Sequence, residues 1–172
     1  MGGSHRSRML DFPDAPGLRP TPDRVRETLF NWLGQDLYGL RCLDLFAGSG
    51  ALGFEAASRG AEQVVMVEKN RQVHQALAAN VAKLRLGNVA LHWADGLEFA
   101  RGETGRYDVV FLDPPFQSDY LPKALDMLQY KLSESGRVYV ETGVAYQPPQ
   151  GWRVLKSKRA GQVNYQLLER DD

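Results

Sequence analysis

Cysteine is almost absent from this chain of 172 residues, which contains Cys42 alone. A single cysteine excludes an internal disulfide and a zinc cluster built from cysteines. Only three histidines occur, and none has a partner at metal-ligand spacing, so we expect no metal site. No apolar run approaches the roughly 18 residues that a membrane helix needs, and the N-terminus lacks the apolar core of a secretory signal. We therefore expect a cytoplasmic protein.

An excess of charge of either sign is lacking as well, because Lys and Arg total 21 and Asp and Glu total 21. A neutral chain is a poor general binder of nucleic acid, which requires many phosphate contacts. The cations are nevertheless spread unevenly. Residues 150–168 contain four basic side chains and no acidic one: Arg153, Lys156, Lys158 and Arg159. Such a segment is either solvated surface or a contact for a local anionic partner.

The beginning of the chain differs in composition from the rest. Residues 1–20 are rich in glycine, proline and arginine, and we expect a basic arm or short edge hairpin there. One domain, residues 21–172, should follow. Thr21 is the expected N-cap of its first helix, with Pro22 as the first helical residue. Apolar residues then recur at helical spacing as far as Leu33, and Gly34 ends the pattern.

Strand and helix patterns alternate through the remaining sequence. We expect strands at residues 42–46, 63–67, 89–92, 107–112 and 136–141. Helices are expected at residues 51–59, 70–84 and 118–130, and Asp95 opens a further short one. Residues 152–157 and 162–168 have the pattern of a closing antiparallel pair. The fold class is therefore α/β, with a doubly wound, mostly parallel seven-stranded sheet and a C-terminal antiparallel hairpin.

A glycine-rich turn between the first strand of this sheet and the next helix is the strongest local motif. Gly48, Gly50 and Gly53 allow close backbone approach to a ligand, and the helix N-terminus offers free N–H groups. Glu68 ends the next strand, where a carboxylate can accept hydrogen bonds from ribose hydroxyls. Asp95 follows the third strand and can reach an adenine edge. These positions predict a nucleotide-type cofactor at the carboxyl ends of the strands.

Asp44, four residues before the first glycine, bears on which cofactor this is. The glycine spacing also fits the dinucleotide fingerprint. Dinucleotide-binding folds, however, usually have an apolar residue at the position of Asp44, because the bound pyrophosphate is anionic. A carboxylate suits S-adenosylmethionine (SAM), which carries a sulfonium and an ammonium group. The alternative is structural: Asp44 caps a turn and the glycines permit tight packing.

A second motif, Asp113-Pro114-Pro115-Phe116, directly follows the fourth strand. Two prolines fix two φ angles and remove two N–H donors, so the neighbouring carbonyls point in set directions. The Asp113 carboxylate and the Pro114 carbonyl can hold the two hydrogens of a planar amine, and Phe116 can stack on its ring. The alternative is a rigid turn with Phe116 in the core.

These two motifs and residues 19–33, RPTPDRVRETLFNWL, closely resemble the RsmD family of bacterial 16S rRNA (guanine-966-N2)-methyltransferases. The resemblance extends over nearly the whole chain. It implies a Rossmann-like, SAM-dependent fold and methylation of a guanine amine in the small ribosomal subunit. Members usually have a few residues before Gly2-Gly3 that are missing here, and Ser7 stands where glycine is common. Both departures concern the path of the arm.

The resemblance also implies which residues form the site. The cofactor positions are Asp44, Phe46, Ala47, Gly48, Ser49, Gly50, Glu68, Lys69, Asp95 and Gly96. The catalytic positions are Asp113, Pro114, Pro115 and Phe116. The family's N-terminal signature, expected near the RNA, contains Arg19, Thr21, Arg24 and Asn31. Because a chain of this size has no spare recognition domain, we also expect Arg6, Arg8 and Arg26 to bind RNA.

The expected reaction is an in-line attack of guanine N2 on the sulfonium methyl group, which yields S-adenosylhomocysteine and needs no metal. The enzyme's contribution is mainly positioning and electrostatic stabilisation. Because the chain has no spare domain for target recognition, we expect a monomer that recognises 16S rRNA within an assembled or assembling small subunit. The alternatives are another planar amine, in adenine or a protein glutamine, a dinucleotide-dependent oxidoreductase, or a non-catalytic assembly factor.

Overall fold

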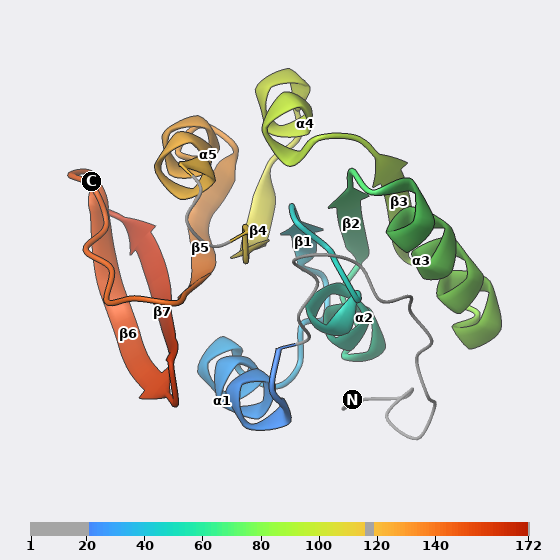
Figure 1. Ribbon diagram of the computed structural model, residues 1–172, viewed down its shortest axis with the longest axis horizontal. Coiled ribbons are helices and arrows are strands. Elements are labelled where there is room, and N and C mark those ends of the chain that lie inside the picture. Colours follow the sequence, from blue (N-terminus) through green and yellow to red (C-terminus); the bar gives the residue numbers. More distant parts are fainter. Residues whose placement is uncertain (1–20, 116–118, 172) are drawn as a thin grey trace.

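The computed structural model describes residues 21–115 and 119–171 of the chain (Figure 1). The helices are α1 (Asp23–Leu33), α2 (Ala51–Ser58), α3 (Arg71–Leu84), α4 (Gly96–Gly102) and α5 (Tyr120–Leu128). The strands are β1 (Arg41–Asp44), β2 (Gln63–Glu68), β3 (Val89–Trp93), β4 (Tyr107–Leu112), β5 (Leu132–Thr142), β6 (Trp152–Ala160) and β7 (Val163–Arg170). The predicted arm, residues 1–20, lies outside the described residues.

All seven strands form one sheet in the order β3-β2-β1-β4-β5-β7-β6. Strands β1 to β5 pair in parallel, whereas β7 runs antiparallel to both β5 and β6. The predicted fold class is therefore confirmed, including the C-terminal hairpin. The strand order reverses between β1 and β4, which is where doubly wound sheets bind their ligands.

Helices cover both faces of the sheet and bury a separate apolar core on each (Figure 1). Helices α1, α2 and α3 pack on one face, and α4 and α5 pack on the other. The central strand β4 is almost wholly buried, as its apolar sequence predicts for a strand covered on both sides. Among the described residues, no helix is long and apolar enough to span a bilayer.

Helix boundaries follow local capping chemistry, with one correction. The side chains of Asn70 and Asp95 accept hydrogen bonds from the backbone N–H groups of the residues three positions later, at 3.0 and 3.1 Å. The prediction of Thr21 as an N-cap is wrong. Helix α1 begins at Asp23, because Pro22 keeps an extended ψ of 146° and is itself the N-cap residue without a side-chain cap.

Several strand boundaries also differ from the expected ones. Strand β1 ends at Asp44 instead of residue 46, because the chain leaves the sheet there for the glycine-rich turn. Strand β5 begins at Leu132 instead of residue 136, because an irregular register between Tyr107 and Val109 lets the earlier segment pair with β4. Strands β6 and β7 are longer than predicted, since they pair along almost their full lengths.

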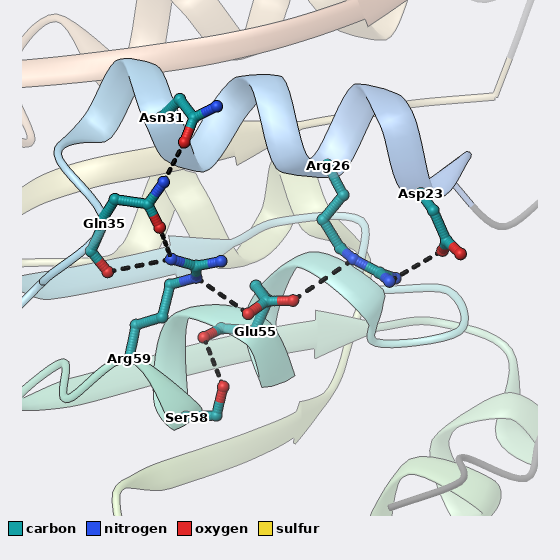
Figure 2. A network of polar contacts seen from close by, with 7 residues as sticks. All are labelled: Asp23, Arg26, Asn31, Gln35, Glu55, Ser58 and Arg59. Atoms are coloured by element: carbon teal, nitrogen blue, oxygen red, sulfur yellow. Dashed lines mark hydrogen bonds and ion pairs between the residues drawn. The ribbon is translucent and has the colours of Figure 1, made fainter. Parts of the chain in front are cut away.

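A buried acid links helix α1 to helix α2 (Figure 2). The Glu55 side chain is 2% exposed, and its two oxygens meet Arg26 Nε at 3.4 Å and Arg59 Nε at 2.9 Å. Arg26 also pairs with Asp23 at 2.8 Å, and Arg59 donates to the Gln35 carbonyl at 3.2 Å. The network fixes α1 against α2, and α2 directly follows the glycine-rich turn.

Candidate active site

Four acidic side chains gather at the carboxyl edge of the sheet, on four neighbouring strands. They are Asp44 in β1, Glu68 in β2, Asp113 directly after β4, and Glu141 in β5. Asp44 is in register with Met66 and Phe111, and Phe111 is in register with Tyr139. Each of the other three acids lies two residues after one of these partners. Because side chains alternate along a strand, all four point to the face that carries α1, α2 and α3.

The turn between β1 and α2 is shaped by its glycines. Gly48 and Gly50 have φ values of 54° and 85°, a left-handed conformation that favours glycine. A Cβ atom at Gly50 would lie 2.6 Å from a ring carbon of Phe54. Ala47 and Ser49 are buried in the same turn. The predicted strand–turn–helix placement of the motif is confirmed, and the turn is tight enough that a larger residue at position 50 would disturb it.

Asp44 is 2% exposed and accepts a hydrogen bond from the Gly53 N–H at 3.1 Å. The carboxylate therefore caps the first turn of α2, as the structural alternative expected. Burial raises its pKa to about 7, the Gly53 hydrogen bond lowers it, and the nearby Glu68 charge raises it further. Only Oδ2 is used in this bond, and a cationic ligand at the edge would favour the ionised form.

Glu68 stabilises the same turn from the neighbouring strand. Its Oε1 accepts from the Gly48 N–H at 3.0 Å, and its Oε2 accepts from the Asn70 N–H at 2.8 Å. Each carboxylate oxygen has a further lone pair, so Glu68 can still accept hydrogen bonds from a ligand hydroxyl. The residue thus links the turn to the start of α3 at the carboxyl edge of the sheet.

Aromatic and basic side chains lie beside this turn. The Phe46 and Tyr120 rings stack with their centroids 5.7 Å apart. Lys69 Nζ lies 3.4 Å from the Tyr120 hydroxyl and 5.4 Å from its ring centroid. The start of α5 therefore lies next to the residues that follow β1 and β2.

Helix α4 approaches the same turn from the other side. The Asp95 side chain caps this helix, so one of its oxygens is already bound to the Glu98 N–H. Gly96 is buried, and a Cβ atom there would lie 2.7 Å from the backbone oxygen of Leu45. Only glycine allows α4 and the turn to approach this closely.

The second motif directly follows the central strand β4. Asp113 is half-buried, Pro114 is buried and Pro115 is exposed, whereas Phe116 lies outside the described residues. Strand β4 pairs with β1, so the motif and the glycine-rich turn leave the sheet from adjacent strands. The structure brings together the two motifs that the sequence separates by more than sixty residues.

A buried tyrosine–glutamate pair beside this motif was not predicted. The Tyr139 hydroxyl donates to Glu141 Oε1 at 2.6 Å, and both residues are buried. The Tyr165 ring lies 6.4 Å from that of Tyr139, and Trp32 of α1 stacks on Tyr165 at 5.2 Å. The available signal was an acid near the end of an apolar strand, the same pattern that identified Asp44 and Glu68.

The predicted RNA-binding residues are placed differently from one another. Arg24 and Asn31 are exposed on α1, and Asn31 accepts a hydrogen bond from Gln35. Thr21 is buried, and Arg26 is engaged by Asp23 and Glu55. The remaining three, Arg6, Arg8 and Arg19, lie outside the described residues.

Strand β6 forms the outer edge of the sheet, and seven of its nine residues are exposed in a row. It carries the basic cluster Arg153, Lys156, Lys158 and Arg159. Arg153 pairs with Glu169 and, at 3.6 Å, with Asp171. Lys156 and Lys158 are exposed, so they present positive charge along the outer edge of the sheet.

The fold and the carboxyl-edge site define the class of Rossmann-like methyltransferases. A structure from Escherichia coli titled "Putative methyltransferase yhhF" is 42% identical, with a TM-score of 0.87 over 99% of this chain and 96% of that one. "Ribosomal RNA small subunit methyltransferase D" of E. coli is 42% identical over 99% of this chain and 89% of the relative. The protein of that name from Haemophilus influenzae is 38% identical over 98% and 92%.

A family model described as "Conserved hypothetical protein 95" matches residues 1–169. The chain belongs to this family, the RsmD family, and the resemblance found in the sequence is confirmed.

Proposed function

We propose that this protein transfers the methyl group of SAM to the exocyclic N2 amine of a guanine in the rRNA of the small ribosomal subunit. The observation that carries the proposal is the meeting of two motifs on adjacent strands. The glycine-rich turn after β1 and the Asp-Pro-Pro motif after β4 leave the same edge of the sheet. A methyl donor held by one and an amine held by the other would be neighbours.

The cofactor site in this proposal is built from Asp44, Glu68, Asp95 and the turn around Gly48. The residues present fit SAM: a buried carboxylate for a cationic group, a second carboxylate for ribose hydroxyls, and left-handed glycines that let the backbone come close. Phe46, Ala47, Ser49, Lys69 and Gly96 complete the surroundings of the turn. When bound, SAM supplies an electrophilic methyl group on a sulfonium.

The amine site is formed by Asp113 and Pro114, with Pro115 fixing the turn and Phe116 as the stacking partner in the proposal. The exocyclic amine of guanine is a weak nucleophile, because its lone pair is delocalised into the ring. Hydrogen bonds from its two N–H groups to the Asp113 carboxylate and the Pro114 carbonyl would let the nitrogen pyramidalise. Methyl transfer would form the N–C bond as the S–C bond breaks, and Asp113 or water would take the proton that the product nitrogen loses.

The RNA surface in this proposal combines the exposed residues of α1, the residues Arg6, Arg8 and Arg19 of the arm, and the basic edge of β6. Arg24 and Asn31 are open to a partner, whereas Thr21 and Arg26 support the position of α1. A target base must leave its stack to reach the amine site, which costs a few kcal/mol at most in a loop. A neutral monomer with these local contacts suits a folded rRNA surface better than naked rRNA. An rRNA substrate places the reaction in the cytoplasm.

Transfer of a labelled methyl group from SAM to small subunits that lack the modification tests the proposal, with naked 16S rRNA in parallel. We expect transfer to subunits, loss of at least about 100-fold with Asp113→Ala, and no change with Asp126→Ala, an exposed acid on α5. Transfer that survives Asp113→Ala would contradict the assigned role of the motif. Equal activity on naked rRNA would contradict the assembled subunit as substrate.

A further inference from the structure

Glu141 is a carboxylate that the proposed function leaves without a role, although it lies next to the amine site. Strands β4 and β5 are parallel, and Leu112 is in register with Val140. Asp113 and Glu141 each follow that pair by one residue. Their side chains therefore leave adjacent strands at the same level and on the same face of the sheet.

The Glu141 carboxylate is held in one orientation. The residue is 6% exposed, and Oε1 accepts the hydrogen bond of the fully buried Tyr139 hydroxyl at 2.6 Å. Within residues 21–115 and 119–171, no group donates a hydrogen bond to Oε2. An ionised carboxylate can only accept hydrogen bonds, so this oxygen can accept one from a ligand.

The electrostatics of Tyr139 support the closeness of this pair to the amine site. The pKa of Tyr139 is well above its ordinary value, first because of burial and then because of Glu141 and of the charge of Asp113. The Asp113 carboxylate thus acts on the hydroxyl that holds Glu141. The two acids belong to one polar region at the ends of β4 and β5.

We propose that Glu141 Oε2 accepts the N1–H of the target guanine, and that Tyr139 is a positioning residue that keeps this oxygen available. The inference rests on the proposed function. In guanine, N1–H is a donor directly beside the N2 amine, whose two hydrogens are assigned to Asp113 and Pro114. In adenine, N1 is an acceptor, and its lone pair would face a buried carboxylate oxygen. Glu141 therefore supplies the base selectivity that the Asp-Pro-Pro motif alone does not provide.

The substrate 2-aminopurine separates this role from a structural one, because it keeps the 2-amino group but has an unprotonated N1. Small subunits can be reconstituted with this base in place of the target guanine. For the unaltered protein, we expect kcat/KM to be about 10- to 100-fold higher on guanine, as one hydrogen bond to a charged group predicts. Equal values on the two bases would overturn the inference and leave the proposed function intact.

Glu141→Gln should change the preference between the two bases. The Tyr139 hydroxyl would bind the amide oxygen and leave the amide N–H₂ to donate to N1 of 2-aminopurine. We expect activity on guanine to fall about 10-fold or more, and activity on 2-aminopurine to be kept or raised. Glu134→Gln, at an exposed position of the same strand, is the matched control and should change neither value.

The other results are equally decisive. An equal loss on both bases with Glu141→Gln, with SAM affinity unchanged, would mean a structural role and would overturn the inference. If Glu141→Gln does not fold, two other measurements test the inference. The unaltered protein should prefer guanine over 2-aminopurine, and Tyr139→Phe should reduce that preference. Failure of the unaltered protein to methylate any guanine would refute the proposed function itself, a result distinct from methylation without selectivity.

Discussion

Asp44 is a buried carboxyl group beside a position proposed for a cation, so its ionisation should control cofactor binding. Its pKa is raised to about 7, chiefly by burial. Below pH 7 the group is protonated and no longer attracts a cation, so SAM affinity should fall as the pH is lowered. We expect binding about tenfold weaker at pH 6 than at pH 8, measured by titration calorimetry.

Asp44→Asn is the control for that pH dependence. The amide does not titrate in this range, so the variant should bind SAM more weakly and show only the pH response of the ligand itself. An unaltered protein that binds SAM equally well at pH 6 and pH 8 would contradict the role of Asp44.

Gly96 and Gly102 lie at opposite ends of the same short helix and form a matched pair. A Cβ atom at Gly96 would lie 2.7 Å from the Leu45 carbonyl oxygen, whereas none of the surrounding atoms lies within 4 Å of one at Gly102. Gly96→Ala should cost about 1–3 kcal/mol and weaken SAM binding, because α4 must move away from the turn. Gly102→Ala should stay within about 0.5 kcal/mol. Urea denaturation of both variants measures the two losses of stability. Equal midpoints would contradict the close contact between Gly96 and the turn.

Helix α1 depends on the buried ion network for its position, because Glu55 joins it to α2. Glu55→Ala would leave Arg26 and Arg59 without their shared partner, and we expect a loss of about 2 kcal/mol or more. Asp23→Ala, which removes an acid whose side chain is 85% exposed, should cost less than about 1 kcal/mol. A thermal or urea denaturation series that gives similar losses for the two variants would show that the network does not hold α1.

Strand β6 should contribute to RNA binding without affecting the cofactor. Replacing Lys156 and Lys158 together by alanine should raise KM for subunits several-fold. The slope of log affinity against log salt should also become shallower, by about one for each phosphate that a lysine neutralises. SAM affinity should be unchanged. Lys83→Ala is the control, because Lys83 is exposed on α3, which lies at the opposite end of the sheet from β6 (Figure 1). Unchanged KM and salt slope in the double variant would exclude the β6 edge from the interface.

The elements that the sequence predicted well are those whose signal is local. Asn70 and Asp95 cap their helices within three residues, and the turn at Gly48 and Gly50 needs the conformation that glycine favours. The start of α1 was misplaced by the Thr-Pro pattern, since a proline with extended ψ is itself the cap. The length of β5 depends on an irregular register with β4, which no local pattern records.

The Tyr139–Glu141 pair was missed for a related reason. A tyrosine and a glutamate two residues apart in a strand are common, and their meaning depends on β4 lying next to β5. The aromatic contacts around them join α1, β5 and β7, which are far apart in the sequence. Asp44, the glycine-rich turn and Glu68 lie within 25 residues of sequence and were recognisable, whereas Asp113 and Glu141 are brought together only by the pairing of β4 with β5.

At the scale of the whole molecule, the proposed function requires one seven-stranded sheet to hold the cofactor, the amine and the RNA surface together. The carboxyl edge of the sheet allows this, because turns from β1, β2 and β4 and the end of β5 all meet there. Strand β6 lies at the outer edge of the sheet, and α1 packs on the same face of the sheet as α2 and α3 (Figure 1). The account therefore predicts selectivity that depends on the shape of the substrate as well as on contacts to the base.

The most direct test of the central claim is the identity of the methylated nucleoside. Small subunits labelled with the purified protein and SAM can be digested to nucleosides and resolved by mass spectrometry. The account predicts N2-methylguanosine at a single rRNA position and none with Asp113→Ala. A label found on adenosine, on ribose or on ribosomal protein would contradict it.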